Sequence, residues 1–167
     1  MNPIELAYCA GIIDGEGYIG ISKNKDNNYT YHIKYEYAIQ VMMTDKPPIE
    51  FLAKTFNGKI VTFTKRRKHP LHSVTFRGRA AERVLNIILP YLVGKRNQAS
   101  TVLKFCDLRK RWKDYRCVKP SERVASGQIV PRMAISPKYL NLCEFYYQQC
   151  KNYKTRNQKT NQRLFNV

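Results

Sequence analysis

The sequence has 167 residues, of which 43% are hydrophobic, so it is long enough for one domain with a buried core. Its 30 lysines and arginines against 12 acidic residues give a formal net charge of +18, which favours nucleic acid as a partner. No apolar run approaches the roughly 20 residues of a membrane span and no leader segment is evident, so we expect a soluble, intracellular protein with no membrane partner. The five cysteines contain no C-x-x-C pair, which argues against a disulfide framework and a zinc finger and predicts buried free thiols.

The segment from Asn2 to Glu5 predicts the start of a helix. Asn2 suits the cap, proline suits the first helical position, and Glu5 completes a capping box. Within this helix, Ala7, Gly11 and Gly15 are spaced four residues apart. Residues at this spacing lie on one helix face, so they form a stripe of small side chains along which two helices could come into backbone contact.

A four-stranded sheet is predicted from the segments that follow. Residues 18–23 and 29–43 predict two strands, and the longer one alternates with period two between a packed face and a face that meets polar surroundings. Residues 46–56 predict a second helix. The remaining predicted elements are two strands at 59–64 and 71–77 and three helices, at 79–91, at 95–113 and from Ser136 onward.

The order of these elements predicts an α+β fold, αββαββα, with four antiparallel strands in one sheet, helices on one face and the other face free. We expect a single domain over residues 1–167, with its core at about 3–113 and a helical C-terminal extension at 114–167. The basic tail from Lys151 onward is expected to be mobile or to become ordered on nucleic acid.

Two motif interpretations of the glycine-rich segment fail on context. Residues 15–20 match the G-x-G-x-x-G pattern of a dinucleotide-binding loop, and Glu36 lies near the expected ribose-binding acid. That fingerprint needs a strand before the glycines and a helix after them, whereas the order here is reversed. A calcium loop counted from Asp14 places Lys25 where a bidentate Glu is required. A purely structural helix stop remains an alternative.

The two acids at this predicted helix end favour a metal site. Asp14 and Glu16 stand where the helix dipole disfavours negative charge, so a positive partner is expected. A divalent cation fits, because carboxylates and terminal carbonyls are hard oxygen ligands. If two copies pack along Ala7, Gly11 and Gly15, each contributes one Glu16, and such paired carboxylates can hold metal ions against a phosphate for phosphodiester hydrolysis.

The segment CAGIIDGEG, residues 9–17, closely resembles the signature of the LAGLIDADG homing endonucleases. The order of elements extends the resemblance over about residues 3–113. It implies a saddle-shaped sheet in the DNA major groove and two motif helices that form the interface and the active-site floor. A single motif implies a homodimer that cuts both strands of a long, partly palindromic site. The implied cofactor is Mg²⁺, two or three ions per dimer site, with Ca²⁺ expected to bind without supporting cleavage.

The resemblance also implies roles for individual residues. It assigns metal binding to Glu16 and the backbone carbonyl of Gly15, and it makes Asp14 a residue that closes the helix end or supports the interface. The segment LPYLVGKRNQA resembles the family segment with a basic residue near the scissile phosphates, which implies that role for Lys95; a solvated lysine at a helix N-terminus is the alternative. The water-ordering polar residue departs from the family pattern, and the nearby candidates are Gln40, which we take as the catalytic one, Thr44 and Asp45.

DNA recognition by the sheet follows independently, because a β-ribbon fits the major groove and alternate side chains reach base edges. The candidates for base contacts are Ser22, Asn24, His32, Lys34, Glu36, Gln40, Thr62, Thr64, Arg66, Ser73, Thr75 and Arg77. Lys65, Arg67 and Lys68 are expected to meet phosphates. For each, an ordinary solvated strand face is the alternative. The alternative functions are an intron-splicing maturase that binds its own intron RNA and a non-cleaving DNA-binding regulator; organelle, phage and prokaryotic cytoplasm all stay open.

Overall fold

The computed structural model describes residues 2–25, 33–65, 68–118, 122–123, 129–130 and 133–164. The chain begins with α1, Pro3–Glu16, whose predicted capping box is confirmed. The backbone N–H of Ile4 donates to Asn2 Oδ1 at 3.0 Å, and that of Asn2 donates to Glu5 Oε2 at 3.3 Å. The helix buries one face, formed by Leu6, Cys9, Ala10 and Ile13.

The predicted four-stranded sheet is confirmed. Its strands are β1 (Gly17–Lys25), β2 (Ile33–Met43), β3 (Ile60–Phe63) and β4 (Leu71–Arg77). All neighbouring pairs are antiparallel and the order across the sheet is β1-β2-β4-β3. Residues 29–32, which were predicted to belong to the second strand, lie outside the described residues.

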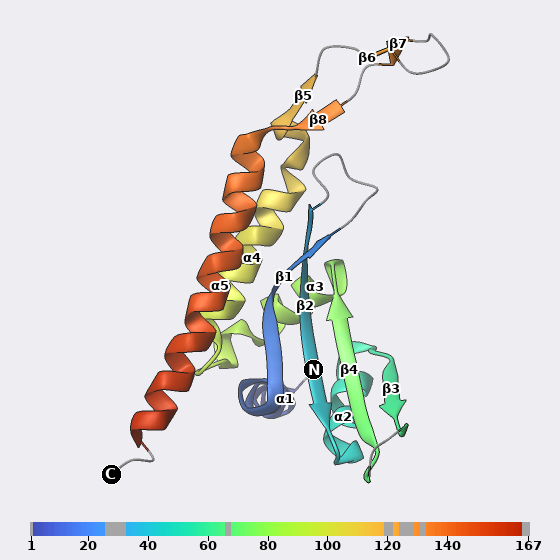
Figure 1. The fold of residues 1–167 in the computed structure, drawn as a ribbon. Helices are drawn as coiled ribbons and strands as arrows, with labels where there is room; N and C mark the ends of the chain where they lie inside the picture. Colours follow the sequence, from blue (N-terminus) through green and yellow to red (C-terminus); the bar gives the residue numbers. More distant parts are fainter. Residues whose placement is uncertain are drawn as a thin grey trace.

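Helices cover one face of this sheet (Figure 1). They are α2 (Lys46–Phe56), α3 (Arg79–Ile88) and α4 (Arg96–Lys110), with a short 3₁₀ turn at Leu89–Tyr91 between the last two. The packed residues of the strands alternate as predicted, since Tyr37, Ile39 and Val41 of β2 are buried and meet Val74 and Phe76 of β4 in the same core. The αββαββα order is therefore confirmed.

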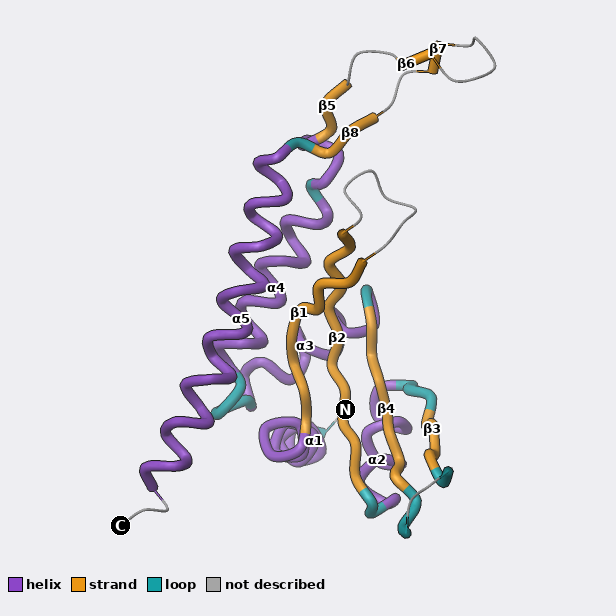
Figure 2. The backbone as a smooth tube through the Cα atoms, viewed as in Figure 1, coloured by secondary structure: helices purple, strands orange, loops and turns teal. Residues whose placement is uncertain are grey.

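The C-terminal extension differs from the prediction in two respects. Four short strands, β5 (Arg116–Val118), β6 (Glu122–Arg123), β7 (Ile129–Val130) and β8 (Met133–Ile135), pair as β5-β8 and β6-β7 (Figure 2). Runs of two or three residues carry no usable periodicity, which explains why they were not predicted. The last helix, α5 (Pro137–Leu164), includes most of the basic tail, for which no helix was predicted; whether the tail is mobile or becomes ordered on nucleic acid stays a prediction. Lys, Arg and Gln are good helix formers, and no glycine or proline follows Pro137.

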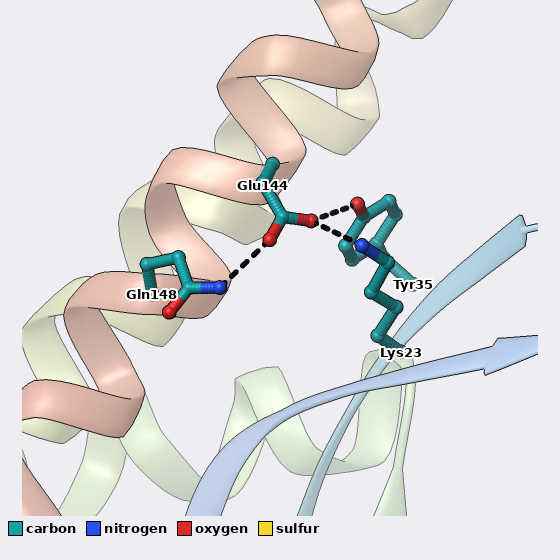
Figure 3. Close-up of polar contacts among 4 residues, drawn as sticks. All are labelled: Lys23, Tyr35, Glu144 and Gln148. Atoms are coloured by element: carbon teal, nitrogen blue, oxygen red, sulfur yellow. Dashed lines mark hydrogen bonds and ion pairs between the residues drawn. The ribbon is translucent and has the colours of Figure 1, made fainter.

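Helix α5 lies beside α4 and along the edge strand β1 (Figure 1). Glu144 connects it to the sheet, because its carboxylate accepts from Lys23 Nζ at 2.9 Å and from the Tyr35 hydroxyl (Figure 3). Gln148 Nε2 donates to the other oxygen at 2.8 Å. These donors, Lys23 first, lower the pKa of Glu144 to about 2. Although α5 has 28 residues, no helix in the described part of the chain is apolar enough to span a membrane.

Candidate active site and nucleic-acid interface

The end of α1 and the start of α4 meet at Asp14. Its carboxylate accepts three backbone N–H bonds, from Val93 at 2.7 Å, Gly94 at 3.2 Å and Lys95 at 2.8 Å. Helix α4 has no capping side chain of its own, so Asp14 satisfies the unpaired N–H groups that a helix start leaves. The carboxylate of Asp14 is thus used within its own chain, which agrees with a residue that closes a helix end; its interface role stays a prediction.

The side chain of Lys95 in turn contacts the end of α1. Its Nζ donates to the backbone carbonyls of Ile13 at 2.9 Å and Asp14, and lies 3.5 Å from that of Gly15. Since α1 has no basic residue in its last turn, this ammonium compensates the negative end of the helix dipole. Burial lowers the pKa of Lys95, while the nearby carboxylates of Asp14 and Glu16 oppose that shift. The side chain of Lys95 is therefore half-buried and hydrogen-bonded rather than extended into solvent, and its role near the scissile phosphates stays a prediction.

Glu16 is the last residue of α1 and is exposed. Its carboxylate makes no hydrogen bond or ion pair with any residue that the structure describes, in contrast to that of Asp14, although it acts electrostatically on the ammonium of Lys95. The chain leaves the helix at Gly17, where a Cβ would lie 2.5 Å from the carbonyl oxygen of Ile13, so only glycine fits this exit. The carboxylate of Glu16 and the carbonyl of Gly15 consequently stand at an accessible helix end, as oxygen donors of the type that Mg²⁺ prefers.

Gln40 lies at the same end of the sheet as Glu16. It pairs in register with Tyr18 of β1, two residues after Glu16. Its amide Nε2 donates to Ser73 Oγ at 3.5 Å, and the side chain is half-buried. Gln40 therefore pairs with a residue that lies two positions after Glu16. Its catalytic role stays a prediction.

The outer face of α1 is uncovered. Ala7 and Gly11 are exposed, and a Cβ added at Gly11 or Gly15 would meet nothing within 4 Å. The fold of the protomer therefore gives no reason for glycine at either position. Ile4 and Tyr8 lie on the same helix face with 76% and 51% of their surface exposed, and the sequence interpretation had not included them.

The open face of the sheet carries most of the residues predicted to contact bases. Register pairs Asn24 with Lys34, Ser22 with Glu36, Gln40 with Thr75 and Ala38 with Arg77. Paired residues share a face, so the predicted phase of β1, β2 and β4 is confirmed. Glu36 is the centre of a polar network, because Lys34 Nζ lies 2.9 Å from its carboxylate and Asn24 Nδ2 donates to it at 3.2 Å. The contact with Lys34 is the main cause that lowers the pKa of Glu36.

Residues 9–111 match the sequence model of a family described as LAGLIDADG endonuclease. The chain belongs to the LAGLIDADG endonuclease family. The family predicted from residues 9–17 is therefore confirmed, as is the fold class. No curated protein matches the sequence.

Solved structures of other LAGLIDADG proteins share the fold. The homing endonuclease I-CvuI in complex with the I-CreI target has 19% identity and a TM-score of 0.67, over 90% of this chain and 82% of that chain. I-CeuI complexed with DNA has 15% identity and a TM-score of 0.57, over 68% and 59%. I-SmaMI bound to cleaved DNA has 19% identity and a TM-score of 0.55, over 68% and 38%. At these identities the likeness concerns the fold alone.

One strand of this LAGLIDADG sheet has the opposite phase to the one predicted. Thr62 pairs with His72, and its Oγ1 lies 2.9 Å from His72 Nδ1 on the helix-covered side. Val61 and Phe63 take the open face instead, and Thr64 falls beyond the end of β3. The prediction is wrong because apolar residues occur in both phases of this strand, and Ile60 packs against the core opposite Val74.

The remaining predicted DNA contacts differ in exposure. Ser73 shares the open face but is only 3% exposed, so neighbouring side chains cover it. Lys65 and Lys68 are exposed on either side of the turn between β3 and β4. His32, Arg66 and Arg67 lie outside the described residues.

A cavity of about 690 Å³ lies behind the sheet, on the helix-covered side. Aromatic side chains from β2, α4 and the segment after it line it, among them Tyr35, Phe105 and Trp112. It contains none of Glu16, Gln40 and Lys95. This cavity is therefore separate from the candidate site at the exposed end of α1 and on the open face of the sheet.

Proposed function

We propose that this chain is a homodimeric, site-specific endonuclease that cuts both strands of a long, partly palindromic DNA site using Mg²⁺. The observation that carries the proposal is Glu16, an exposed carboxylate at the end of the motif helix that makes no hydrogen bond or ion pair among the described residues of its own protomer. Family membership supplies the reaction class. The family relatives I-CvuI and I-CeuI have been seen in complexes with DNA, which supports double-stranded DNA as the substrate.

The residues at this helix end fit a magnesium ion. The Glu16 carboxylate and the Gly15 carbonyl are hard oxygens, and Mg²⁺ keeps several waters, so it needs few protein ligands. Within the described part of one protomer, no three acidic, histidine or cysteine side chains gather as a metal site. In the proposed dimer, Glu16 of the other copy supplies a second carboxylate. Bound metal would activate water and stabilise the leaving oxygen, with two or three ions per dimer site.

The uncovered face of α1 supports the dimer. A two-fold axis along Ala7, Gly11 and Gly15 lets the backbones of two helices approach, and the exposed Ile4 and Tyr8 would be buried at the same time. Such a crossing brings two copies of the Glu16 helix end together. In this proposal, α1 both forms the dimer interface and carries the metal ligand Glu16 at its end.

Lys95 and Gln40 complete the proposed centre. The ammonium of Lys95 lies beside the carbonyls that precede Glu16, where a positive charge can stabilise a phosphate. Gln40, at the adjacent end of β2, is proposed to order the attacking water through its amide. The open sheet face, with Asn24, Lys34 and the rest of its polar set, is proposed to read the major groove.

The proposal is tested with duplexes selected from a randomised pool for binding in Ca²⁺. The enriched sequence is cloned into a supercoiled plasmid and incubated with Mg²⁺ or with Ca²⁺. The proposal predicts linear product in Mg²⁺ and binding without cleavage in Ca²⁺. Binding without cleavage under either metal would instead support a non-cleaving DNA-binding protein. A preference for the protein's own intron RNA over DNA would support a maturase.

A further inference from the structure

Three apolar side chains stand on the open face of the sheet, and we call them the apolar row: Met42, Val61 and Phe63. They are 41%, 46% and 45% exposed. Met42 pairs with Ser73, Ser73 pairs with Val61, and Phe63 follows two residues later on the same strand and face. The row thus lies on β2 and β3, on either side of Ser73 of β4, on the face that carries the predicted base contacts.

The residues around the apolar row are typical of a protein surface that binds nucleic acid. Gln40 and Thr75 lie beside it on the same face, and Lys65 follows β3 with an exposed side chain. The chain carries a net charge of +18, which disfavours a basic or neutral protein partner at this face relative to a polyanion. Exposed apolar clusters of this kind mark binding sites. The partner whose charge is opposite to that of this basic chain is DNA.

The major groove offers one apolar group to such a row, the C5 methyl of thymine. We propose that Met42, Val61 and Phe63 form a subsite that reads thymine methyl groups in each half-site; the inference rests on the proposed function. Side chains without hydrogen-bonding groups cannot distinguish the other base edges by donors and acceptors, whereas the thymine methyl is recognised by apolar contact alone.

The strand register predicts which base pairs the subsite meets, namely the inner ones of each half-site, next to the cleavage positions. Gly17, directly after Glu16, pairs with Val41, so Met42 lies at the catalytic end of the sheet. Lys34, at the other end of β2, is eight residues away, or roughly 26 Å along the strand. The thymines read by the apolar row are therefore expected next to the cleavage positions, and the outer base pairs are expected to meet polar side chains.

The test replaces thymine by deoxyuridine, which lacks only the C5 methyl. Duplexes are selected from a randomised pool in Ca²⁺, and the affinity of the intact protein for the enriched duplex is compared with that for duplexes carrying deoxyuridine at inner or outer thymines. We expect affinity to fall about fourfold for each inner methyl removed. Equal affinity for the thymine and deoxyuridine duplexes would overturn the inference.

Variants locate the effect. Val61→Thr keeps the shape of the side chain but replaces one methyl group by a hydroxyl, and Phe63→Ser removes the ring. Both are expected to abolish the difference between thymine and deoxyuridine at inner positions, while Phe145→Ser, a change at an aromatic on α5 that is also exposed, leaves it intact. A difference that persists in both variants would assign the methyl contact elsewhere and overturn the inference. Failure to enrich any duplex would overturn the proposed function as well, whereas an enriched site without thymine dependence would overturn only the subsite.

Discussion

Asp14 and Lys95 cap each other's helices. The Asp14 carboxylate accepts the backbone N–H of Lys95 at 2.8 Å, and the Lys95 ammonium donates to the backbone carbonyl of Asp14. The first contact gives a hydrogen-bond acceptor to a backbone N–H group at the start of α4, and the second gives a donor to a backbone carbonyl at the end of α1. Because Glu16 lies two residues after Asp14, this pair fixes the helix end from which the proposed metal ligand projects.

Replacing Asp14 by Ala should destabilise the protein. The three backbone N–H groups of Val93, Gly94 and Lys95 lose their acceptor, which is expected to lower the free energy of unfolding by about 2 kcal/mol. Urea denaturation followed by circular dichroism measures the change. The matched control is Asp107→Ala, at an exposed acid on α4 that makes only a surface ion pair and should change stability by about 0.5 kcal/mol or less. Equal stability of the two variants would contradict the capping role.

Replacing Gly11 by Leu should separate the proposed dimer without unfolding the protomer. A Cβ at this position meets nothing within 4 Å in its own chain, so the variant is expected to fold with little loss of stability. The leucine would keep two α1 helices from close approach. Sedimentation velocity should then find a monomer where the parent protein is a dimer. Asn86→Leu, on an exposed position of α3, is the control and should leave the mass unchanged. A variant that stays dimeric would exclude this stripe as the interface.

The contact between α5 and the sheet should depend on pH through Glu144. Lys23, Tyr35 and Gln148 favour its ionised form and lower its pKa from 4.5 to about 2. A lowered pKa stabilises the fold above the ordinary value, and this contribution is lost as pH falls from 4.5 towards 2. Glu144→Gln is therefore expected to lower the free energy of unfolding by about 1 kcal/mol at pH 7.

Denaturant titrations of both proteins at pH 7, 5 and 3 measure this dependence. The difference between them should be constant from pH 7 to 5 and smaller at pH 3. Glu50→Gln, which removes an exposed ion pair with Lys46, serves as the control and should have a smaller effect. A difference for Glu144→Gln that does not change with pH would contradict the assigned pKa.

Much of the fold follows from local patterns. The capping box at Asn2 and the period-two alternation of β2 each depend on neighbouring residues alone, and both predictions are confirmed. The nine-residue motif ending at Gly17 predicted the family for the same reason. Patterns of this kind need no knowledge of the tertiary structure.

The rest depends on contacts between distant segments. Asp14 and Lys95 are 81 positions apart, so no local pattern shows that each caps the other's helix. The phase of β3 was mistaken because both phases contain apolar residues, and only the pairing of Ile60 with Val74 decides between them. The long α5 helix is stabilised by contacts such as Glu144 with the sheet, which its polar tail does not reveal.

The central claim is that Glu16 binds the catalytic metal, and Glu16→Gln tests it most directly. The amide keeps the size of the side chain but is a weaker ligand for Mg²⁺. Cleavage of the selected duplex in Mg²⁺ is measured together with its binding in Ca²⁺, and Glu50→Gln is the control. We expect the Glu16 variant to lose cleavage by at least about a hundredfold while its affinity for DNA stays within about threefold. Cleavage at the parent rate by Glu16→Gln would contradict the account.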